Sequence, residues 1–528
     1  MSRRWLTRCP CLTAAPTWLF FAAVWTVFPL LIYGLLREAH SYQTAMLPGA
    51  LVLTVALLAL GWAHPTVYFV GALPLAVLNV AYAHTAHFWQ IGDLPVRVET
   101  ALDSSPEESR EFFNQFVLHA KFTWLLAAYL LGVLALGGLY WYFYHRGKKP
   151  AHPWRQLALG VAAAAVVTAA GWSALQTYPA TALGITIYKV YTRVNPILGR
   201  KERVEAFMAQ APPLHCTAPY DKIVFVLGES ARRDLMSAYG FDRPTTPFLD
   251  NLPHKVLLRG ISPANQTMTA VPLIMTPATV ADYDKFYTSP SIVSDLKRCG
   301  YQTVWLSNQL RYSPYTSTVS SIASEADVVR FSEEYLHLRG SAPDEVLFQM
   351  FSPNDLVAGK KQAYFFHLIG SHFEYQKRYP VDQALIPHPK DQIEAYLNTI
   401  HYTDHVLQRI FETFRSHSQN MLFIYISDHA EWLTPERGGH AHAHPFQEEY
   451  RIPWVFWSTS PDDPKLAAIA HEAGDQLVNS EALDIQIRYL LGLEAAPGLS
   501  FSTKVFALGP GRVYDYLQLP AQGAPETH

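Results

Sequence analysis

The chain has 528 residues, of which 50% are hydrophobic and only 16% charged. Soluble domains typically carry about a quarter charged residues, so the deficit indicates strongly apolar segments beside at least one soluble domain. The net charge of −3 argues against a broad nucleic-acid-binding surface, and we expect no nucleic-acid partner.

The first third contains five apolar segments of the length needed to cross a bilayer. They are Thr17–Leu36, Met46–Ala63, Thr66–Ala83, Phe122–Tyr144 and Leu157–Leu175. The first has no obvious small-residue cleavage site and is followed by further spans, so we read it as a retained helix and not as a signal peptide. We therefore predict a transmembrane domain of five helices over residues 1–176.

Basic residues predict the orientation of this domain. They gather before the first span and between the fourth and the fifth: Arg3, Arg4, Arg8, Arg146, Lys148, Lys149 and Arg155. Five spans put both groups on one side, which the positive-inside rule makes cytoplasmic. We expect an inner-membrane protein with a cytoplasmic N-terminus, an interfacial bridging segment over residues 177–217 and a periplasmic domain over residues 218–528.

From Tyr220 onward, short apolar runs alternate with helix-like stretches, which is typical of an α/β domain with a mostly parallel sheet. The expected strands are Ile223–Leu227, Val256–Ile261, Thr303–Leu306, Tyr364–Ile369, Met421–Ile426 and Trp454–Trp457. Cys216 and Cys299 in this part of the chain would be able to pair in an oxidising compartment, which the sequence alone does not decide.

Polar side chains follow three of these strands, at Glu229 and Ser230, at Asp428 and His429, and at His372. The carboxyl ends of parallel strands meet at one edge of a sheet, so we expect these side chains to form a metal site. Nitrogen and oxygen ligands suit zinc, and manganese also fits. An alternative is that Glu229 and Ser230 only cap the next helix.

Two loops are expected to complete the site. The glycine-flanked stretch 438–445 carries His440, His442 and His444, one of which would serve as a second acid or phosphate ligand; an adventitious metal binder is the alternative. Thr269 follows the strand Val256–Ile261. A zinc-coordinated hydroxyl is a nucleophile near neutral pH, and a helix beginning after Gln266 would favour a bound phosphate, although a plain N-cap describes the same position.

Four stretches together resemble the bacterial phosphoethanolamine transferases: Gly228–Pro247, Thr267–Pro272, Gly370–Tyr375 and Tyr425–Glu431. These are inner-membrane enzymes with five N-terminal helices and a periplasmic domain of the sulfatase/alkaline-phosphatase fold. The resemblance implies a Zn²⁺ site formed by Glu229, Thr269, Asp428 and His429, with Thr269 also the nucleophile. It implies catalytic roles for His372 and for His442, which matches the family's H-x-x-P histidine, with His440 or His444 as alternatives.

The resemblance also implies substrates. Thr100, Ser104 and Glu108 fall at the spacing of family residues that contact the ethanolamine headgroup, and Asn308 and His444 are expected to bind substrate. The implied reaction moves phosphoethanolamine from phosphatidylethanolamine, through a phosphoethanolamine-threonine, to lipopolysaccharide core or lipid A. The S-N-Q at 307–309 and the R-Y-P at 378–380 look closer to the subgroup acting on core heptose.

Two other functions compete with this interpretation. One is a transferase of the same superfamily that uses another headgroup, such as phosphoglycerol, on a periplasmic glucan. The other is a membrane-bound interaction protein that has lost its activity, against which the intact set of Glu229, Thr269, Asp428 and His429 argues.

Overall fold

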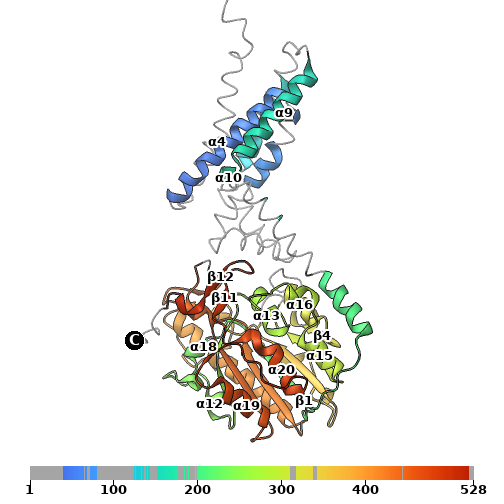
Figure 1. Ribbon diagram of the computed structural model, residues 1–528. Coiled ribbons are helices and arrows are strands. Elements are labelled where there is room, and N and C mark those ends of the chain that lie inside the picture. Colours follow the sequence, from blue (N-terminus) through green and yellow to red (C-terminus); the bar gives the residue numbers. More distant parts are fainter. Residues whose placement is uncertain are drawn as a thin grey trace, which may run out of the picture. The chain divides into compact units, whose positions relative to one another are not determined.

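The structure is a computed structural model (Figure 1). It describes residues 40–64, 152–175, 199–309, 317–336, 342–442 and 444–521, with shorter stretches between 66 and 197. The chain divides into two compact units, residues 1–192 and residues 193–528, and each is described by itself. The domain boundaries expected at residues 176 and 217 stay predictions.

In the first unit, α4 (His40–Ala63) packs along α9 (Pro153–Ala170), which is followed by α10 (Trp172–Leu175). The two helices fall on the second and fifth predicted spans; the first predicted span lies outside the described residues. Searched over the described residues alone, none of the helices combines the length and the apolar character that crossing a bilayer requires. The five spans therefore stay a prediction.

The second unit is built on an eight-stranded sheet with the order β10-β2-β9-β6-β1-β5-β3-β4. The strands are β1 (Lys222–Gly228), β2 (Val256–Ile261), β3 (Gln302–Ser307), β4 (Val328–Phe331), β5 (Gln362–His367), β6 (Met421–Ser427), β9 (Arg451–Ser458) and β10 (Leu477–Asn479). Only β9 runs antiparallel to its neighbours in this described sheet. The prediction of an α/β domain with a mostly parallel sheet is confirmed.

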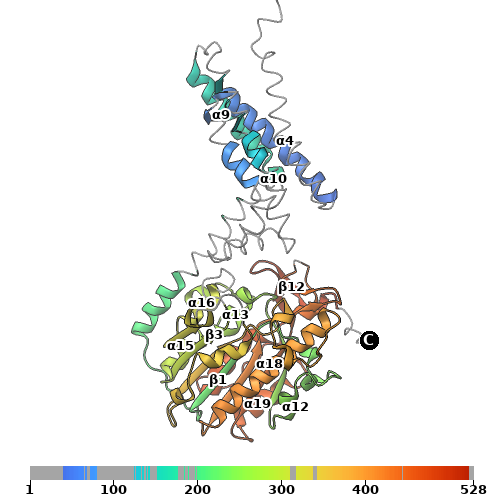
Figure 2. The same ribbon diagram turned by 180° about the vertical axis from the view of Figure 1, so that it is seen from behind.

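Helices cover both faces of the sheet, because side chains along a strand alternate between its faces. Ile223, Phe225 and Leu227 of β1 join one buried cluster, whereas Val224 and Val226 join the other. The first cluster includes residues of α13 (Thr267–Met275), α15 (Ile292–Arg298), α16 (Ser317–Ala323), α19 (Pro464–Ala473) and α20 (Leu483–Leu491). The second includes residues of α12 (Pro247–Asn251) and α18 (Gln392–Arg415), the long helix in front of the sheet in Figure 2. Shorter helices are α14 (Lys285–Thr288) and α17 (Ser332–Leu336).

A helix over residues 199–210 is fixed to this unit by a buried cation and a disulfide. The guanidinium of Arg200 is fully buried, donates to the Phe286 carbonyl (2.7 Å) and pairs with Glu325 Oε1 (2.6 Å). Six residues after the helix, Cys216 forms a disulfide with Cys299 across 83 residues of chain. The pairing that the sequence left open is thus present.

We predict that replacing both cysteines by serine destabilises the second unit. A cross-link that closes a loop of this size stabilises a protein by about 2–4 kcal/mol, mainly by restricting the unfolded chain. The double variant should unfold at a lower urea concentration than the oxidised full-length chain, followed by tryptophan fluorescence in detergent. Reductant should lower the midpoint of the wild type and leave that of the double variant unchanged; equal midpoints for the two oxidised proteins would contradict the prediction.

Candidate metal centre and active site

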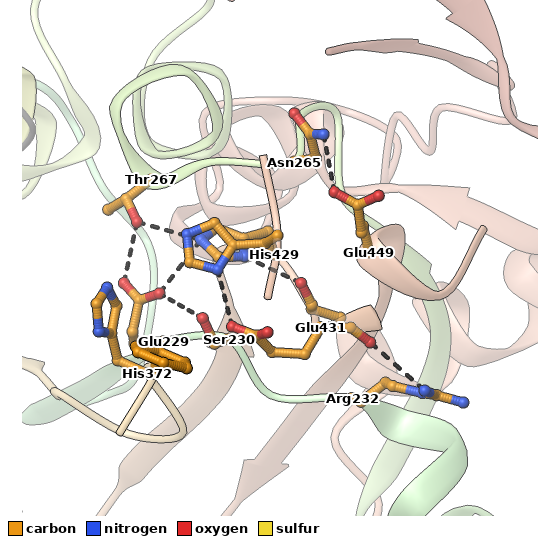
Figure 3. A network of polar contacts seen from close by, with 12 residues as sticks. Glu229, Ser230, Arg232, Asn265, Thr267, His372, His429, Glu431 and Glu449 are labelled. Atoms are coloured by element: carbon orange, nitrogen blue, oxygen red, sulfur yellow. Dashed lines mark hydrogen bonds and ion pairs between the residues drawn. The ribbon is translucent and has the colours of Figure 1, made fainter. Parts of the chain in front are cut away.

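The predicted metal ligands come from two adjacent strands. β1 and β6 pair in parallel up to Gly228 and Ser427, so Glu229 and Asp428 leave the same edge of the sheet at the same level. Ligand atoms of Glu229, Asp428 and His429 all lie within 4.8 Å of one another, and the three side chains are buried. His429 Nε2 lies 3.2 Å from Glu229 Oε1 (Figure 3). The same nitrogen lies 3.5 Å from Asp428 Oδ2.

The charges of this cluster fit a divalent cation. Asp428 Oδ2 is buried and lies 3.5 Å from His429 Nε2, and a buried carboxylate is costly unless a cation neutralises it. Burial and the nearby Glu229 raise the pKa of Asp428 to about 7. Burial alone would lower the pKa of His429, but Asp428 and Glu229 raise it to about 10. Two carboxylates and an imidazole form a ligand set that suits zinc.

Local backbone geometry orients the carboxylates of Glu229 and Asp428. Ser230 adopts a left-handed conformation (φ 58°), which lets its N–H donate to Asp428 Oδ1 (3.2 Å) while its hydroxyl donates to Glu229 Oε1 (2.7 Å). The capping interpretation of Glu229 and Ser230 is wrong, because the N-cap of the next helix (Arg233–Leu235) is Arg232 and this helix has no side-chain cap. Gly370 also has positive φ (49°), and a Cβ there would lie 2.7 Å from the Glu229 carbonyl oxygen.

The structure brings Thr267, and not Thr269, to the cluster. Thr267 is the first residue of α13; its hydroxyl donates to Glu229 Oε2 (3.0 Å) and lies 3.3 Å from His429 Nε2 (Figure 3). Thr269 is only 2% exposed, and its hydroxyl accepts a hydrogen bond from Gln266 Nε2 (3.1 Å). Two positions along a helix differ by about 200°, so both hydroxyls cannot face the same group. The structure therefore does not bring the hydroxyl of Thr269 into contact with the cluster, and the role that the T-x-T-A pattern gave to Thr269 stays a prediction.

His440 is the histidine of its loop that lies beside the cluster. Its ring centre is 4.1 Å from that of His429 and 5.7 Å from that of His372, and its Nδ1 lies 2.8 Å from Glu431 Oε1. Burial lowers the pKa of His372 to about 4. These contacts support the placement of His372 at the site and favour the alternative His440.

The other two histidines of the loop have different surroundings. His442 Nδ1 lies 3.2 Å from Glu449 Oε1, and its ring packs edge-on against Trp432. Burial would lower the pKa of His442, but the hydrogen bond to Glu449 raises it. His444 is exposed. The structure therefore does not bring His442 or His444 into contact with the cluster among the described residues.

Neighbouring strand ends contribute two more side chains. Asn308 Nδ2 donates to Asp344 Oδ1 (2.9 Å), whose carboxylate also accepts from the N–H groups of Ile369 and Gly370. Asn308 thus braces the loop that leads to His372. Gln309 Nε2 donates to Glu229 Oε2 (3.0 Å), a contact that our sequence analysis missed although Gln309 follows the strand adjacent to β5. Thr100, Ser104 and Glu108 lie outside the described residues and stay predictions.

Residues 221–479 match the family described as Sulfatase. The putative transferase YhbX of Escherichia coli (strain K12) is 31% identical over 243 residues, covering 45% of this chain and 43% of that protein. The phosphoethanolamine transferases EptC and OpgE of the same strain are each 27% identical, over 259 and 312 residues, covering 45% and 56% of this chain and 45% and 58% of their own. The matches thus span about half the length of these relatives.

Two solved structures show the fold. The integral membrane protein lipooligosaccharide phosphoethanolamine transferase A (EptA) from Neisseria meningitidis superposes with a TM-score of 0.58 at 16% identity, covering 90% of this chain and 95% of its own. The C-terminal periplasmic domain of EcEptC from Escherichia coli, in complex with Zn, superposes with a TM-score of 0.51 at 23% identity, covering 59% and 97%. The second unit therefore has the fold that the sequence predicted.

We predict that Asp428→Asn reduces zinc retention by about tenfold or more, because a neutral amide is a far weaker ligand than a carboxylate. Full-length protein would be equilibrated with zinc, dialysed, and its metal content measured by plasma mass spectrometry. Asp404→Asn is the matched control, since Asp404 is also a buried carboxylate but accepts the N–H groups of Phe248 and Leu249. Equal zinc in all three proteins would rule out the cluster as the metal site.

Proposed function

We propose that this chain, whose residues 221–479 form a sulfatase-family domain resembling the phosphoethanolamine transferases, transfers phosphoethanolamine from phosphatidylethanolamine to an envelope acceptor. The observation that carries the proposal is the hydroxyl of Thr267, which lies within hydrogen-bond distance of Glu229 and His429 in a buried cluster of metal-ligand type. A hydroxyl so placed has the surroundings of an activated nucleophile.

Glu229, Asp428 and His429 would hold a zinc ion, with Thr267 beside them. A bound zinc ion supplies positive charge that lowers the pKa of a neighbouring hydroxyl and stabilises charge on a phosphoryl oxygen. Support comes from the ligand set, from the burial of both carboxylates, and from the zinc complex of the EcEptC domain, which shares this fold.

Thr267 is also well placed to receive a phosphate. It is half-buried, whereas Thr269 is only 2% exposed. As the first residue of α13 it lies at a helix N-terminus, where free backbone N–H groups and the helix dipole attract anions. The same position therefore offers a nucleophile and a binding site for the group under attack.

The proposed first step forms a bond between Thr267 Oγ1 and the phosphorus of phosphatidylethanolamine and breaks the bond from phosphorus to the diacylglycerol oxygen. The proton lost by Thr267 ends on that oxygen, and diacylglycerol leaves. His372, whose ring lies 5.7 Å from that of His440, is the group proposed to carry the proton. In the second step an acceptor hydroxyl attacks phosphorus, the bond to Oγ1 breaks, and Thr267 regains a proton from the acceptor.

The proposed setting is the bacterial inner membrane, with the N-terminus in the cytoplasm and the second unit in the periplasm. The superposition on integral-membrane EptA over 90% of this chain supports it, as does the disulfide between Cys216 and Cys299. Disulfides form and persist in oxidising compartments such as the periplasm. Lipopolysaccharide core or lipid A is the proposed acceptor.

We predict that Thr267→Ala lowers the turnover of phosphatidylethanolamine by about 1,000-fold or more, since removing the nucleophile abolishes the covalent route. Thr269→Ala is the matched control: it removes the same atoms two positions away in α13 and should retain activity within about tenfold. Diacylglycerol release by detergent-solubilised full-length protein with zinc measures both. An active Thr267→Ala variant beside an inactive Thr269→Ala variant would return the role to Thr269.

A further inference from the structure

Three segments that are distant in sequence meet beside the start of α13. The first is residues 262–266, which lead into that helix. The second is the histidine loop, residues 440–446. The third is the hairpin turn, residues 507–512, which joins β11 (Lys504–Phe506) to β12 (Val513–Asp515).

The side chain of Asn265 connects all three segments. Asn265 is fully buried, and its Nδ2 donates to Glu449 Oε2 (2.9 Å) and to the His442 carbonyl oxygen (3.2 Å). Its Oδ1 accepts from the N–H of Leu508 in the hairpin turn (3.1 Å). Its own carbonyl oxygen accepts from the N–H of Ala441 (3.1 Å). Each polar group of the Asn265 side chain thus forms its hydrogen bonds with a segment other than its own.

Glu449 extends this connection through the histidine loop. Its buried carboxylate accepts from the N–H of His442 (3.2 Å) and the N–H of Phe446 (2.8 Å), and Oε1 lies 3.2 Å from His442 Nδ1 (Figure 3 shows its contact with Asn265). A buried carboxylate needs such donors, because an unpaired one costs free energy. Asn265 supplies the donor that ties this carboxylate to the segment leading into α13.

The hairpin turn lies against the same helix start. The N–H of Phe506 donates to the Pro263 carbonyl (2.8 Å), and a Cβ at Gly509 would lie 3.6 Å from Thr269 Oγ1 and 3.7 Å from Gln266 Nε2. Leu508, whose N–H is held by Asn265, has a left-handed backbone (φ 57°) that a non-glycine residue rarely adopts. This conformation persists only where surrounding contacts enforce it.

We propose that Asn265 is a positioning residue that fixes the histidine loop and the hairpin turn relative to Thr267. The inference rests on the proposed function and deepens it. Thr267 follows Asn265 by two residues, and His440 precedes the Ala441 amide bound to the Asn265 carbonyl. Asn265 therefore sets the distance between the attacking hydroxyl and the histidine beside the metal cluster. Small displacements of such groups lower turnover because reacting groups must be held within about 0.5 Å.

Asn479 offers a matched control. It is also fully buried and makes three side-chain hydrogen bonds: Oδ1 accepts from the N–H of Glu481 (3.1 Å), and Nδ2 donates to the carbonyl oxygens of Ser502 and Lys504 (3.1 Å each). These bonds hold the base of the same hairpin, and none of them reaches the histidine loop. A general loss of buried hydrogen bonds would affect both asparagine variants alike.

The test compares Asn265→Ala and Asn479→Ala in the full-length, zinc-loaded protein. We expect similar decreases in Tm, whereas kcat with phosphatidylethanolamine falls about 10- to 100-fold for Asn265→Ala and less than about threefold for Asn479→Ala. Hydrogen exchange should accelerate at residues 442, 446 and 508 in the first variant and near residues 481 and 502–505 in the second. Equal kcat values for the two variants at equal Tm would overturn the proposal. Unchanged hydrogen exchange in the histidine loop of Asn265→Ala would also overturn it.

Exchange is measured without substrate, so it separates this inference from the proposed function. A wild type that transfers nothing would refute the function, while the exchange pattern would still decide whether Asn265 holds the two segments.

If Asn265→Ala fails to fold, Asn265→Asp and the double variant Asn265→Asp/Glu449→Gln carry the test. The single change places two carboxylates against each other, and the second change restores a donor and acceptor pair. We expect the double variant to recover about tenfold in kcat over the single one, as part of the lost positioning returns. A double variant no better than the single variant would also overturn the proposal.

Discussion

The site depends on burying two carboxylates and an imidazole together at the end of two parallel strands. His429 lies between Glu229 and Asp428, and the mutual attraction of these charges offsets their loss of hydration only while they stay a few ångströms apart. β1 and β6 enforce that separation, because their register brings Gly228 level with Ser427 in the middle of the sheet. Helices on both faces exclude water from the strands below.

The connections around the cluster are correspondingly rigid. Ser230 has a left-handed backbone, which turns its loop at the end of β1. Gly370 has no side chain, so its loop can pass close to the backbone of Glu229, where a Cβ would collide. Gln309 Nε2 donates a hydrogen bond to Glu229 Oε2, and the hydroxyl of Thr267 donates to the same oxygen. Residues that follow four strands thus surround the carboxylate of Glu229, and Thr267 contacts it from the first turn of α13.

Much of this arrangement could be predicted from the sequence. Strands such as β1 and β6 are continuous apolar runs buried on both faces, and the polar residues that follow them had to meet at one edge. The short strands β4 and β10 offer four and three residues, too few for a periodic signal. The reversed direction of β9 depends on long-range pairing, which its hydrophobicity does not encode.

The site was less predictable where geometry decides between neighbours. Thr267 and Thr269 share one motif, and only the start and the rotation of α13 determine which hydroxyl meets Glu229. Glu431 and Glu449 are acidic residues like many others in sequence. Their roles come from contacts with His440 and His442 that exist only once the loop has folded back. Asn265 gave no chemical signal at all, because its amide acts only by joining distant segments.

The most direct measurement is the mass of the full-length, zinc-loaded protein after incubation with phosphatidylethanolamine and no acceptor, followed by peptide mapping. We expect a single added phosphoethanolamine on Thr267, with an equal amount of diacylglycerol released. An adduct on Thr269, or sustained transfer to an acceptor with no adduct at any stage, would contradict it.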